Sequence, residues 1–290
     1  MTDIEGKERA AAGTPATDAC TAEERAEAET QAPEERPRRN IRLTLSYDGS
    51  DFCGWQVQNN DRTVQGELLR ALEKMHGHPV RITAAGRTDS GVHATGQVAN
   101  FFTELDSIPA PRFRDAVNSY LPKDVRVLHS MEAPQSFHSR RSARLRVYRY
   151  YILCAPVCPP HLRRYCHWSR RPLDIRRLSK MASVSEGEHD FTSFSARGDK
   201  NRSKVRRILH SSFHAEGGFL IYTIAATSFL WKMVRTVMGT FLMLEEAGQG
   251  AEELGAILEA RSRFEAGETA PARGLFLERV VYDGEETGSF

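Results

Sequence analysis

The spacing of apolar residues from Ile41 onward restricts this chain to a fold that mixes strands with helices. Residues 41–47 alternate apolar and polar side chains, as a half-buried strand does. Residues 63–77 instead repeat apolar residues at helical spacing, with Thr63 as the predicted N-cap and Gly77 as the predicted end. The apolar face of this helix consists of Val64, Leu68, Ala71, Leu72 and Met75.

The same mixture of elements continues through both halves of the chain. Further strands are predicted at 79–86, 96–102, 125–132 and 145–153. Further helices are predicted at 111–121, 174–184 and 229–248. Residues 205–228 are typical of a hairpin that turns at Gly217–Gly218. This order indicates an α+β chain of two related lobes, 40–138 and 139–290, with a mixed sheet and flanking helices. The seam should lie near 132–143, although no residue-level repeat is present.

Residues 1–39 differ in composition from the rest of the chain. Met1 to Arg36 carry ten acidic and four basic residues, a balance of −6, which leaves +8 for the rest of a chain whose net charge is +2. The segment is rich in Ala, Glu and Thr and has almost no large apolar residue. It cannot bury enough surface to offset the entropy lost on ordering. We predict a disordered acidic tail, with a short fluctuating helix as the alternative.

The positive remainder of the chain gathers its basic residues into three clusters with interleaved aromatic residues. These clusters are Ser139–Tyr150, His161–Arg177 and Asp199–Arg207. A single cluster of this kind is more often a solvated face than a binding site. Three together favour an anionic partner, because arginine binds phosphates and aromatic rings stack on bases. The sequence therefore points towards nucleic acid.

Membrane, secreted and metal-binding classes are disfavoured. The longest apolar stretch, residues 219–234, is interrupted by Thr, Ser and Lys and is too short for a bilayer span. No signal peptide is visible, and five irregularly spaced cysteines indicate a cytoplasmic chain with reduced thiols. Cys154 and Cys158 are read as plain buried thiols, because no matching CxxC or HxxxH pair follows them. We expect no metal and no cofactor.

Residues 82–101, "ITAAGRTDSGVHATGQVANF", form the most unusual stretch of the sequence. A charged pair, Arg87 and Asp89, lies between an apolar lead-in and an apolar exit, and glycines punctuate the segment. An aspartate flanked by glycines often does no more than cap a turn. The alternative is a carboxylate held in place for catalysis.

Arg235 lies in a predicted helix whose residues are apolar on nearly every side, which is the pattern of a buried helix. A charged residue is almost never fully buried unless it is paired. Either the long side chain of Arg235 reaches solvent, or a carboxylate elsewhere in the chain meets it. The helical pattern does not say which carboxylate that is.

Tyr148 lies in the predicted strand of the first basic cluster. Because side chains alternate between the two faces of a strand, it shares one face with Arg144, Arg146 and Tyr150. Tyr148 is therefore either an ordinary strand tyrosine or an aromatic ring placed on a basic surface.

Taken together, these residues resemble the tRNA pseudouridine synthase A family. The segment "AAGRTDSGVHATGQVANF" is similar to the family signature, and seven further blocks follow the family order. These are "YDGSDFCGWQVQ", "TVQGELLRAL", "NSYLPKDVRV", "FHSRRSARLRVYRYYI", "GEHDFTSF", "FLWKMVRTVMG" and "APARGLFLERVVY". The resemblance covers about Ile41 to Tyr282 and implies the pseudouridine synthase fold around a central basic cleft.

The resemblance also implies roles for individual residues. Asp89 matches the family's essential aspartate, Tyr148 its base-stacking tyrosine and Arg235 the arginine of its "MVR" element. With these roles, Asp89 becomes our candidate for the carboxylate that meets Arg235. Arg87 matches an arginine that handles the flipped nucleotide or the adjacent backbone. Four arginines of the first basic cluster are expected to contact RNA backbone: Arg140, Arg141, Arg144 and Arg146. The sequence departs from the family at Thr236, where an asparagine often follows "MVR".

The implied reaction is the isomerisation of uridine to pseudouridine in the anticodon stem-loop of tRNA, at tRNA positions 38 to 40. The family also implies a homodimer that works in the cytoplasm with tRNA as its partner. One alternative is a tRNA-binding protein or RNA chaperone that performs no chemistry. Another is a glycoside hydrolase, which usually needs a second carboxylate as general acid, and no such partner is apparent in the sequence.

Overall fold

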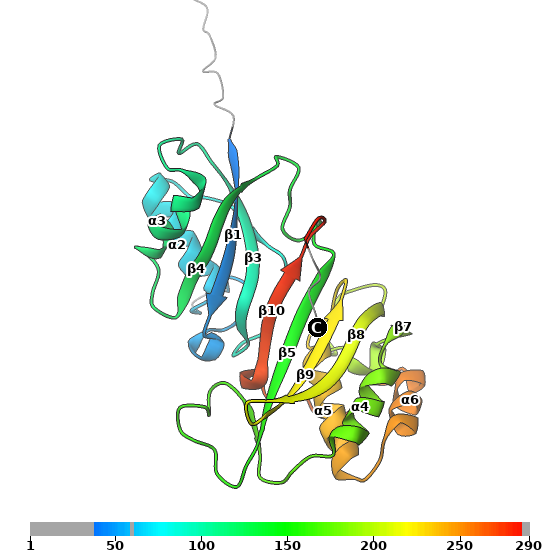
Figure 1. The fold of residues 1–290 in the computed structure, drawn as a ribbon. Helices are drawn as coiled ribbons and strands as arrows, with labels where there is room; N and C mark the ends of the chain where they lie inside the picture. Colours follow the sequence, from blue (N-terminus) through cyan, green and yellow to red (C-terminus); the bar gives the residue numbers. More distant parts are fainter. Residues whose placement is uncertain (1–37, 59–60, 286–290) are drawn as a thin grey trace, which may run out of the picture. The chain divides into compact units, whose positions relative to one another are not determined.

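The computed structural model describes residues 38–58 and 61–285, which form a mixed ten-stranded sheet with helices (Figure 1). The acidic tail predicted for residues 1–39 lies almost wholly outside the described residues. Eight strands follow one another across the sheet in the order β4-β1-β3-β10-β5-β9-β8-β7, and β2 and β6 pair at the side of this path. The predicted α+β class with a mixed sheet is confirmed.

The first part of the chain supplies one side of the sheet. Its strands are β1 (Arg39–Tyr47), β2 (Ile82–Ala84), β3 (His93–Thr103) and β4 (Val125–Ala133), and its helices are α2 (Val64–His76) and α3 (Phe113–Asn118). Strand β1 pairs antiparallel with both β3 and β4, and β2 adds to β3. Alternate β1 side chains are buried, as the period of two predicts.

The second part of the chain supplies the other side. Its strands are β5 (Leu145–Cys154), β6 (His167–Ser169), β7 (Gly187–Asp190), β8 (Val205–Glu216), β9 (Phe219–Ala226) and β10 (Leu275–Val281). Its helices are α4 (Ile175–Val184), α5 (Met233–Glu246) and α6 (Ala251–Ala260). The β8–β9 hairpin turns at Gly217 and Gly218, whose φ angles of 57° and 85° suit glycine.

The last strand lies in the middle of the sheet. Strand β10 pairs parallel with β3, with Phe276 opposite His93, and antiparallel with β5 on its other side. It therefore joins the strands of residues 39–133 to those of residues 145–281 in one continuous sheet (Figure 1). The division into two lobes at residue 138 stays a prediction.

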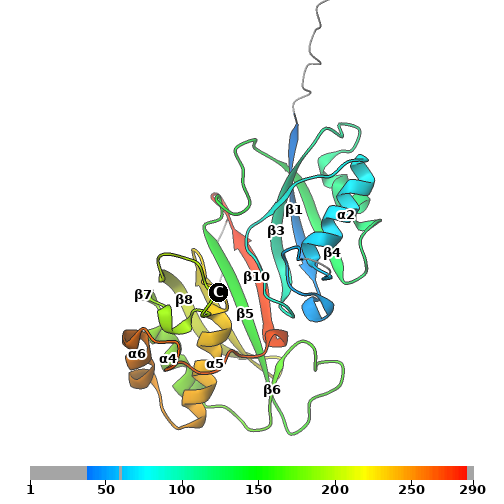
Figure 2. The ribbon, with the colours of Figure 1, turned by 180° about the vertical axis from the view of Figure 1, so that it is seen from behind.

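The helices of both parts cover one face of the sheet, as the view from behind makes clear (Figure 2). One hydrophobic core runs along this face from Leu43 and Leu68 to Tyr150 and Phe241, all of which are fully buried. Burial of this core supplies the main drive for folding. Strands β10 and β5 run between the two groups of helices in this view (Figure 2).

The predicted helix boundaries hold for α2 and fail for α5. The Thr63 hydroxyl accepts a hydrogen bond from the Gly66 amide at 3.2 Å, and Gly77 ends α2 at a φ of 73°. Helix α5 begins at Met233, not at Phe229 as predicted, because Lys232 has a φ of 62°. A left-handed residue interrupts helical geometry, so residues 229–232 form a linker in front of α5.

Candidate active site

Residues 85–92 form a rigid loop between β2 and β3 that contains Asp89, and we call it the aspartate loop. The buried Gln97 side chain donates to the Gly86 carbonyl at 2.9 Å, and the Tyr47 hydroxyl lies 2.8 Å from the Thr88 hydroxyl. The Trp55 amide donates to the Thr88 carbonyl at 3.1 Å. On the other side of Asp89, the Gly91 amide donates to the Phe52 carbonyl at 3.3 Å. The loop is thus held on both sides of Asp89 before any substrate arrives.

A second loop, residues 48–55, packs against this one so closely that two positions require glycine. A β-carbon on Gly54 would lie 2.7 Å from the Thr88 carbonyl oxygen, and the φ of 84° also suits glycine alone. A β-carbon on Gly49 would overlap the Val92 carbonyl. The block "YDGSDFCGWQ" therefore supports the aspartate loop from behind.

Asp89 and Arg235 meet although 146 residues separate them in the chain. The Arg235 Nη1 atom donates to Asp89 Oδ2 at 3.1 Å, and its Nε atom donates to the Ala270 carbonyl at 2.8 Å. The side chain of Arg235 is only 15% exposed, and that of Asp89 is 18% exposed. The predicted pairing is confirmed, and Arg235 does not extend into solvent.

Only one of the two carboxylate oxygens of Asp89 is held by a hydrogen bond. Its Oδ1 atom receives no hydrogen bond from the described residues, whereas Oδ2 is held by Arg235. Arg235 is itself fixed at a second point by the Ala270 carbonyl. The carboxylate is therefore aimed by one oxygen and available through the other.

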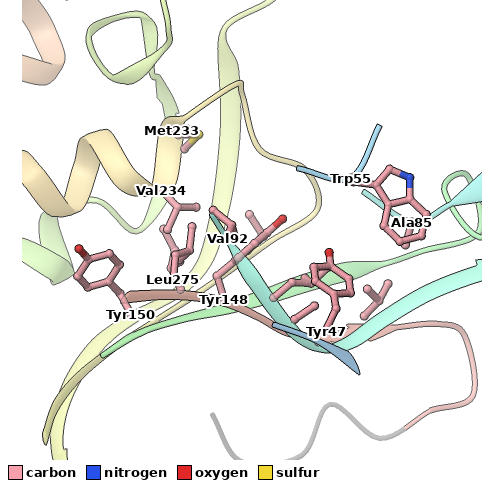
Figure 3. Close-up of a cluster of buried hydrophobic side chains, with 14 of the residues drawn as sticks. Tyr47, Trp55, Ala85, Val92, Tyr148, Tyr150, Met233, Val234 and Leu275 are labelled. Carbon is pink, nitrogen blue, oxygen red and sulfur yellow. The ribbon is translucent and has the colours of Figure 1, made fainter. Parts of the chain in front are cut away.

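Tyr148 projects from β5 between the aspartate loop and the start of α5, beside Val92 and Val234 (Figure 3). Its ring packs edge-on against Phe229 at 5.2 Å between centroids and an interplanar angle of 89°. Tyr148 is largely buried, with 8% of the residue exposed. The hydroxyl has no hydrogen-bond partner among the described residues.

Burial is the main cause that raises the pKa of Tyr148, and Tyr47 and Asp89 nearby add to it. The hydroxyl is therefore protonated at neutral pH. A β-carbon on Gly86 would lie 4.0 Å from it, with no other atom so near, so the glycine leaves this side open. The ring and its hydroxyl form one wall of a site whose other feature is Asp89.

Two of the arginines predicted to contact RNA, Arg140 and Arg141, are exposed and line an open pocket of about 620 Å³. The other residues of this pocket are His138, Ala143, Arg146, Thr227 and Ser228. Arg87 of the aspartate loop is also exposed, and its side chain has no hydrogen-bond or ion-pair partner among the described residues. These arginines keep their donors free for a ligand.

The remaining two arginines have partners in the protein. All five N–H donors of Arg146 point at carbonyl oxygens of Ala85, Arg140, Ala143 and Thr227. It therefore ties β5 to the aspartate loop and leaves only its charge for RNA. Arg144 makes two bonds to Asp283, at 2.5 Å and 2.9 Å, with both side chains exposed. A phosphate would have to compete for it.

Sequence reasoning missed several side chains that support the site. Tyr47, Gln97 and Phe229 each contact a predicted residue or its loop, but they lie in stretches whose apolar pattern indicates only core. The block "YDGSDFCGWQ" carried the one available signal, because two glycines in a short loop often mark close backbone approach.

His93, four residues after Asp89, links the aspartate loop to two other loops. Its Nδ1 atom accepts from the Gly49 amide at 3.0 Å, so the neutral ring carries its proton on Nε2 and donates to the Arg164 carbonyl at 3.0 Å. Asp48 Oδ1 lies 3.2 Å from Nδ1. Burial lowers the pKa of His93 from 6.5 despite the opposing charge of Asp48.

This geometry predicts a pH-dependent contribution to stability. Because the folded pKa of His93 lies below 6.5, the unfolded chain takes up the proton first as the pH falls. The contribution is fully present above pH 6.5 and declines as the pH falls through the folded pKa. Urea midpoints at mildly acidic and alkaline pH should therefore differ more for the wild type than for His93→Asn, which cannot titrate. Equal pH dependence in the two proteins would remove this role for His93.

The described residues hold no group of three or more His, Cys, Asp or Glu side chains placed to bind a metal ion. Cys53, Cys154, Cys158 and Cys166 are free thiols. None of the helices in the described part is long and apolar enough to cross a membrane.

Comparison with known proteins assigns the class of this fold and site. A family model described as tRNA pseudouridine synthase matches residues 44–140 and 181–283, which include Asp89, Tyr47 and Arg235. The chain is 47% identical over 250 residues to tRNA pseudouridine synthase A of Treponema denticola, covering 84% of this chain and 93% of the relative. The protein of the same name from Halalkalibacterium halodurans is 44% identical, covering 83% and 92%, respectively.

A third relative, tRNA pseudouridine synthase A of Moorella thermoacetica, is 43% identical over 244 residues, covering 83% of this chain and 99% of the relative. The class is therefore that of the pseudouridine synthases, which are isomerases. Within that class, this chain belongs to the tRNA pseudouridine synthase A family.

Proposed function

We propose that this protein isomerises uridine to pseudouridine in the anticodon stem-loop of tRNA, with Asp89 as the catalytic group. The observation that carries the proposal is the Asp89–Arg235 pair, in which one carboxylate oxygen is held at 3.1 Å and the other is free. A single carboxylate so placed suits a reaction that exchanges one bond for another at one carbon.

The proposed reaction conserves every atom and electron. The bond between C1′ of the ribose and N1 of uracil breaks, the base rotates, and a bond between C1′ and C5 forms. The proton on C5 leaves and N1 gains a proton. Asp89 is expected to act as nucleophile or base in this exchange, while Arg235 fixes its direction. The base must leave its helical stack to reach the site.

Tyr148 is expected to stack on the uracil, and two substitutions separate its ring from its hydroxyl. Tyr148→Ala should lower kcat/KM by about 10-fold or more, since stacking on an aromatic side chain contributes ~1–3 kcal/mol per base. Tyr148→Phe keeps the ring, so KM should stay near the wild-type value. Any loss should appear in kcat, because the hydroxyl is free to bond the detached base. Steady-state kinetics on a tRNA transcript give kcat and KM separately for each variant. A Tyr148→Ala enzyme with unchanged kcat/KM would exclude the stacking role.

The expected substrate is whole tRNA, read mainly through its shape and phosphates. The exposed cations available for these phosphates include Arg140 and Arg141 at the pocket and Arg87, two residues before Asp89. The family resemblance implies tRNA positions 38 to 40 as targets, a homodimer, and a cytoplasmic location. In such a dimer, one tRNA could place its anticodon arm at Asp89 of one subunit and rest its elbow on the other.

Arg141→Glu should weaken binding to different tRNAs alike and leave the modified position unchanged. The change replaces a cation in the pocket with an anion. Because each phosphate contact contributes about −0.7 to −0.9 to the slope of log affinity against log salt, the slope should become shallower by at least one contact. Arg112→Glu is the matched control, since Arg112 is exposed and lies outside the pocket. Filter binding over a salt series measures the affinity and the salt slope of both variants. Affinity that is nearly independent of salt would contradict this account.

Release of tritium from tRNA labelled at C5 of uridine tests the proposed chemistry, because among the candidate functions only isomerisation detaches that hydrogen. A protein that binds tRNA without chemistry would release none. Wild-type protein is expected to release label in proportion to the pseudouridine formed. Tight tRNA binding without release would favour the RNA-chaperone alternative.

A further inference from the structure

Trp231 is a large aromatic side chain left open to solvent beside the proposed site. It is 48% exposed, whereas Trp55 is 3% exposed and Trp168 is partly covered and donates to the Ala155 carbonyl at 2.7 Å. An exposed Trp contributes little to the core. Its position, in the linker that interrupts the predicted helix, calls for another explanation.

The backbone around Trp231 is firmly held. Its amide donates to Asp199 Oδ2 at 2.6 Å, and its carbonyl accepts from the Ala196 amide at 3.0 Å. The Asp199 side chain is fully buried and also accepts from Lys204 and Asn201. The loop of residues 196–204 therefore clamps the linker, and the clamp fixes where the Trp231 ring can lie.

The surroundings of the ring are basic, and about half of the residue is open to solvent. The backbone of Gly198 packs against the ring, since a β-carbon there would lie 2.9 Å from its Cζ3 atom. The Lys232 ammonium lies 5.2 Å from the ring centroid. Arg197, Lys200 and Arg202 of the clamping loop are exposed as well. An aromatic ring among several exposed cations suits a polyanion that carries flat bases.

The linker connects this ring to the rest of the proposed site. Thr227 and Ser228 line the pocket that contains Arg140 and Arg141, and the next residue, Phe229, packs against Tyr148. Trp231 follows two residues later, at most about 7 Å along the chain. One short segment thus passes from the arginine pocket, past Tyr148, to the exposed ring.

We propose that Trp231 is a stacking platform for an unpaired base of the RNA substrate, next to the uridine that reaches Asp89. Lys232 and the cations of the clamping loop contact the flanking phosphates. This inference rests on the proposed function and adds a second aromatic contact, outside the site of the flipped base. It explains why an indole is held rigidly and exposed at this point.

The test compares Trp231→Ala and Trp231→Phe with wild type, using a tRNA transcript as the probe. Tryptophan fluorescence of the wild type should fall on binding, and most of the fall should vanish in Trp231→Phe but persist in Trp168→Phe. Trp231→Ala should bind tRNA about 10-fold or more weakly, and its KM should rise by a similar factor. Its kcat at saturating tRNA should change little. Trp231→Phe keeps a ring and should lose less. Tyr120→Ala is the matched control, because Tyr120 is 50% exposed and lies beyond α3.

Three results would overturn the inference. The first is equal affinity of Trp231→Ala and wild type. The second is quenching that persists in Trp231→Phe. The third is a sedimenting mass of Trp231→Ala that differs from that of wild type while its RNA affinity is unchanged. That result would make Trp231 a contact between copies of the chain. Wild-type protein that neither binds nor modifies tRNA would refute the proposed function, whereas full activity without a role for Trp231 would refute this inference alone.

Discussion

Asp89→Asn is expected to lower the rate of pseudouridine formation by about 10⁴-fold or more, the scale on which removal of one catalytic group acts. Asparagine fills the same space but supplies neither a nucleophilic oxygen nor a base. Affinity for tRNA should stay within a few-fold of wild type, because binding is shared among many cations. Tritium release measures the rate and filter binding measures the affinity.

Asp51→Asn is the control for this change. Asp51 lies in the loop that packs behind the aspartate loop, is exposed, and pairs with Arg164 at 3.0 Å. Its loss removes a carboxylate from the neighbourhood without touching the Asp89–Arg235 pair, so activity should remain near wild type. Measurable turnover by pure Asp89→Ala protein would end the assignment of Asp89.

Arg235→Leu is expected to reduce both activity and stability. It leaves Asp89 without its cation and the Ala270 carbonyl without its donor. Breaking a buried ion pair typically costs ~3–5 kcal/mol. Because these side chains keep 15% and 18% exposure, we expect the lower end of that range. Activity should fall steeply, since the carboxylate loses the contact that aims it.

A double-mutant cycle on urea unfolding separates the pair from other effects of each substitution. The variants are Asp89→Asn, Arg235→Leu and the two combined, and their coupling in the free energy of unfolding should exceed about 0.5 kcal/mol. Arg235→Lys is a milder change that keeps the charge but loses the second anchor to Ala270. Additive effects of the two substitutions would mean that the contact contributes nothing to stability.

The pairing of Asp89 with Arg235 could be predicted because the family resemblance pointed to Asp89 and because a charged residue in an apolar helix needs a partner. Strand and helix positions followed from periodicity, since alternate burial is a local property. The cap at Thr63 and the hairpin turn at Gly217 also depend only on local chemistry.

Other features depend on contacts that no local pattern encodes. The placement of β10 between β3 and β5 brings together residues from three distant parts of the chain. The start of α5 was misplaced because apolar spacing continues through residues 229–232, while the Asp199 clamp and the left-handed Lys232 break the helix. The contacts of Arg146 could not be read from the sequence, because the four carbonyl groups that accept its five donors come together only in the folded chain.

Mapping pseudouridine in a tRNA transcript shows both where the protein acts and whether Asp89 is required. The transcript is treated with wild-type protein or Asp89→Asn and modified with carbodiimide, and stops of primer extension are read along its whole length. We expect new stops within tRNA positions 38 to 40 for wild type and none for Asp89→Asn. Stops confined to another part of the tRNA would refute the anticodon assignment, and stops that persist in Asp89→Asn would contradict catalysis by Asp89.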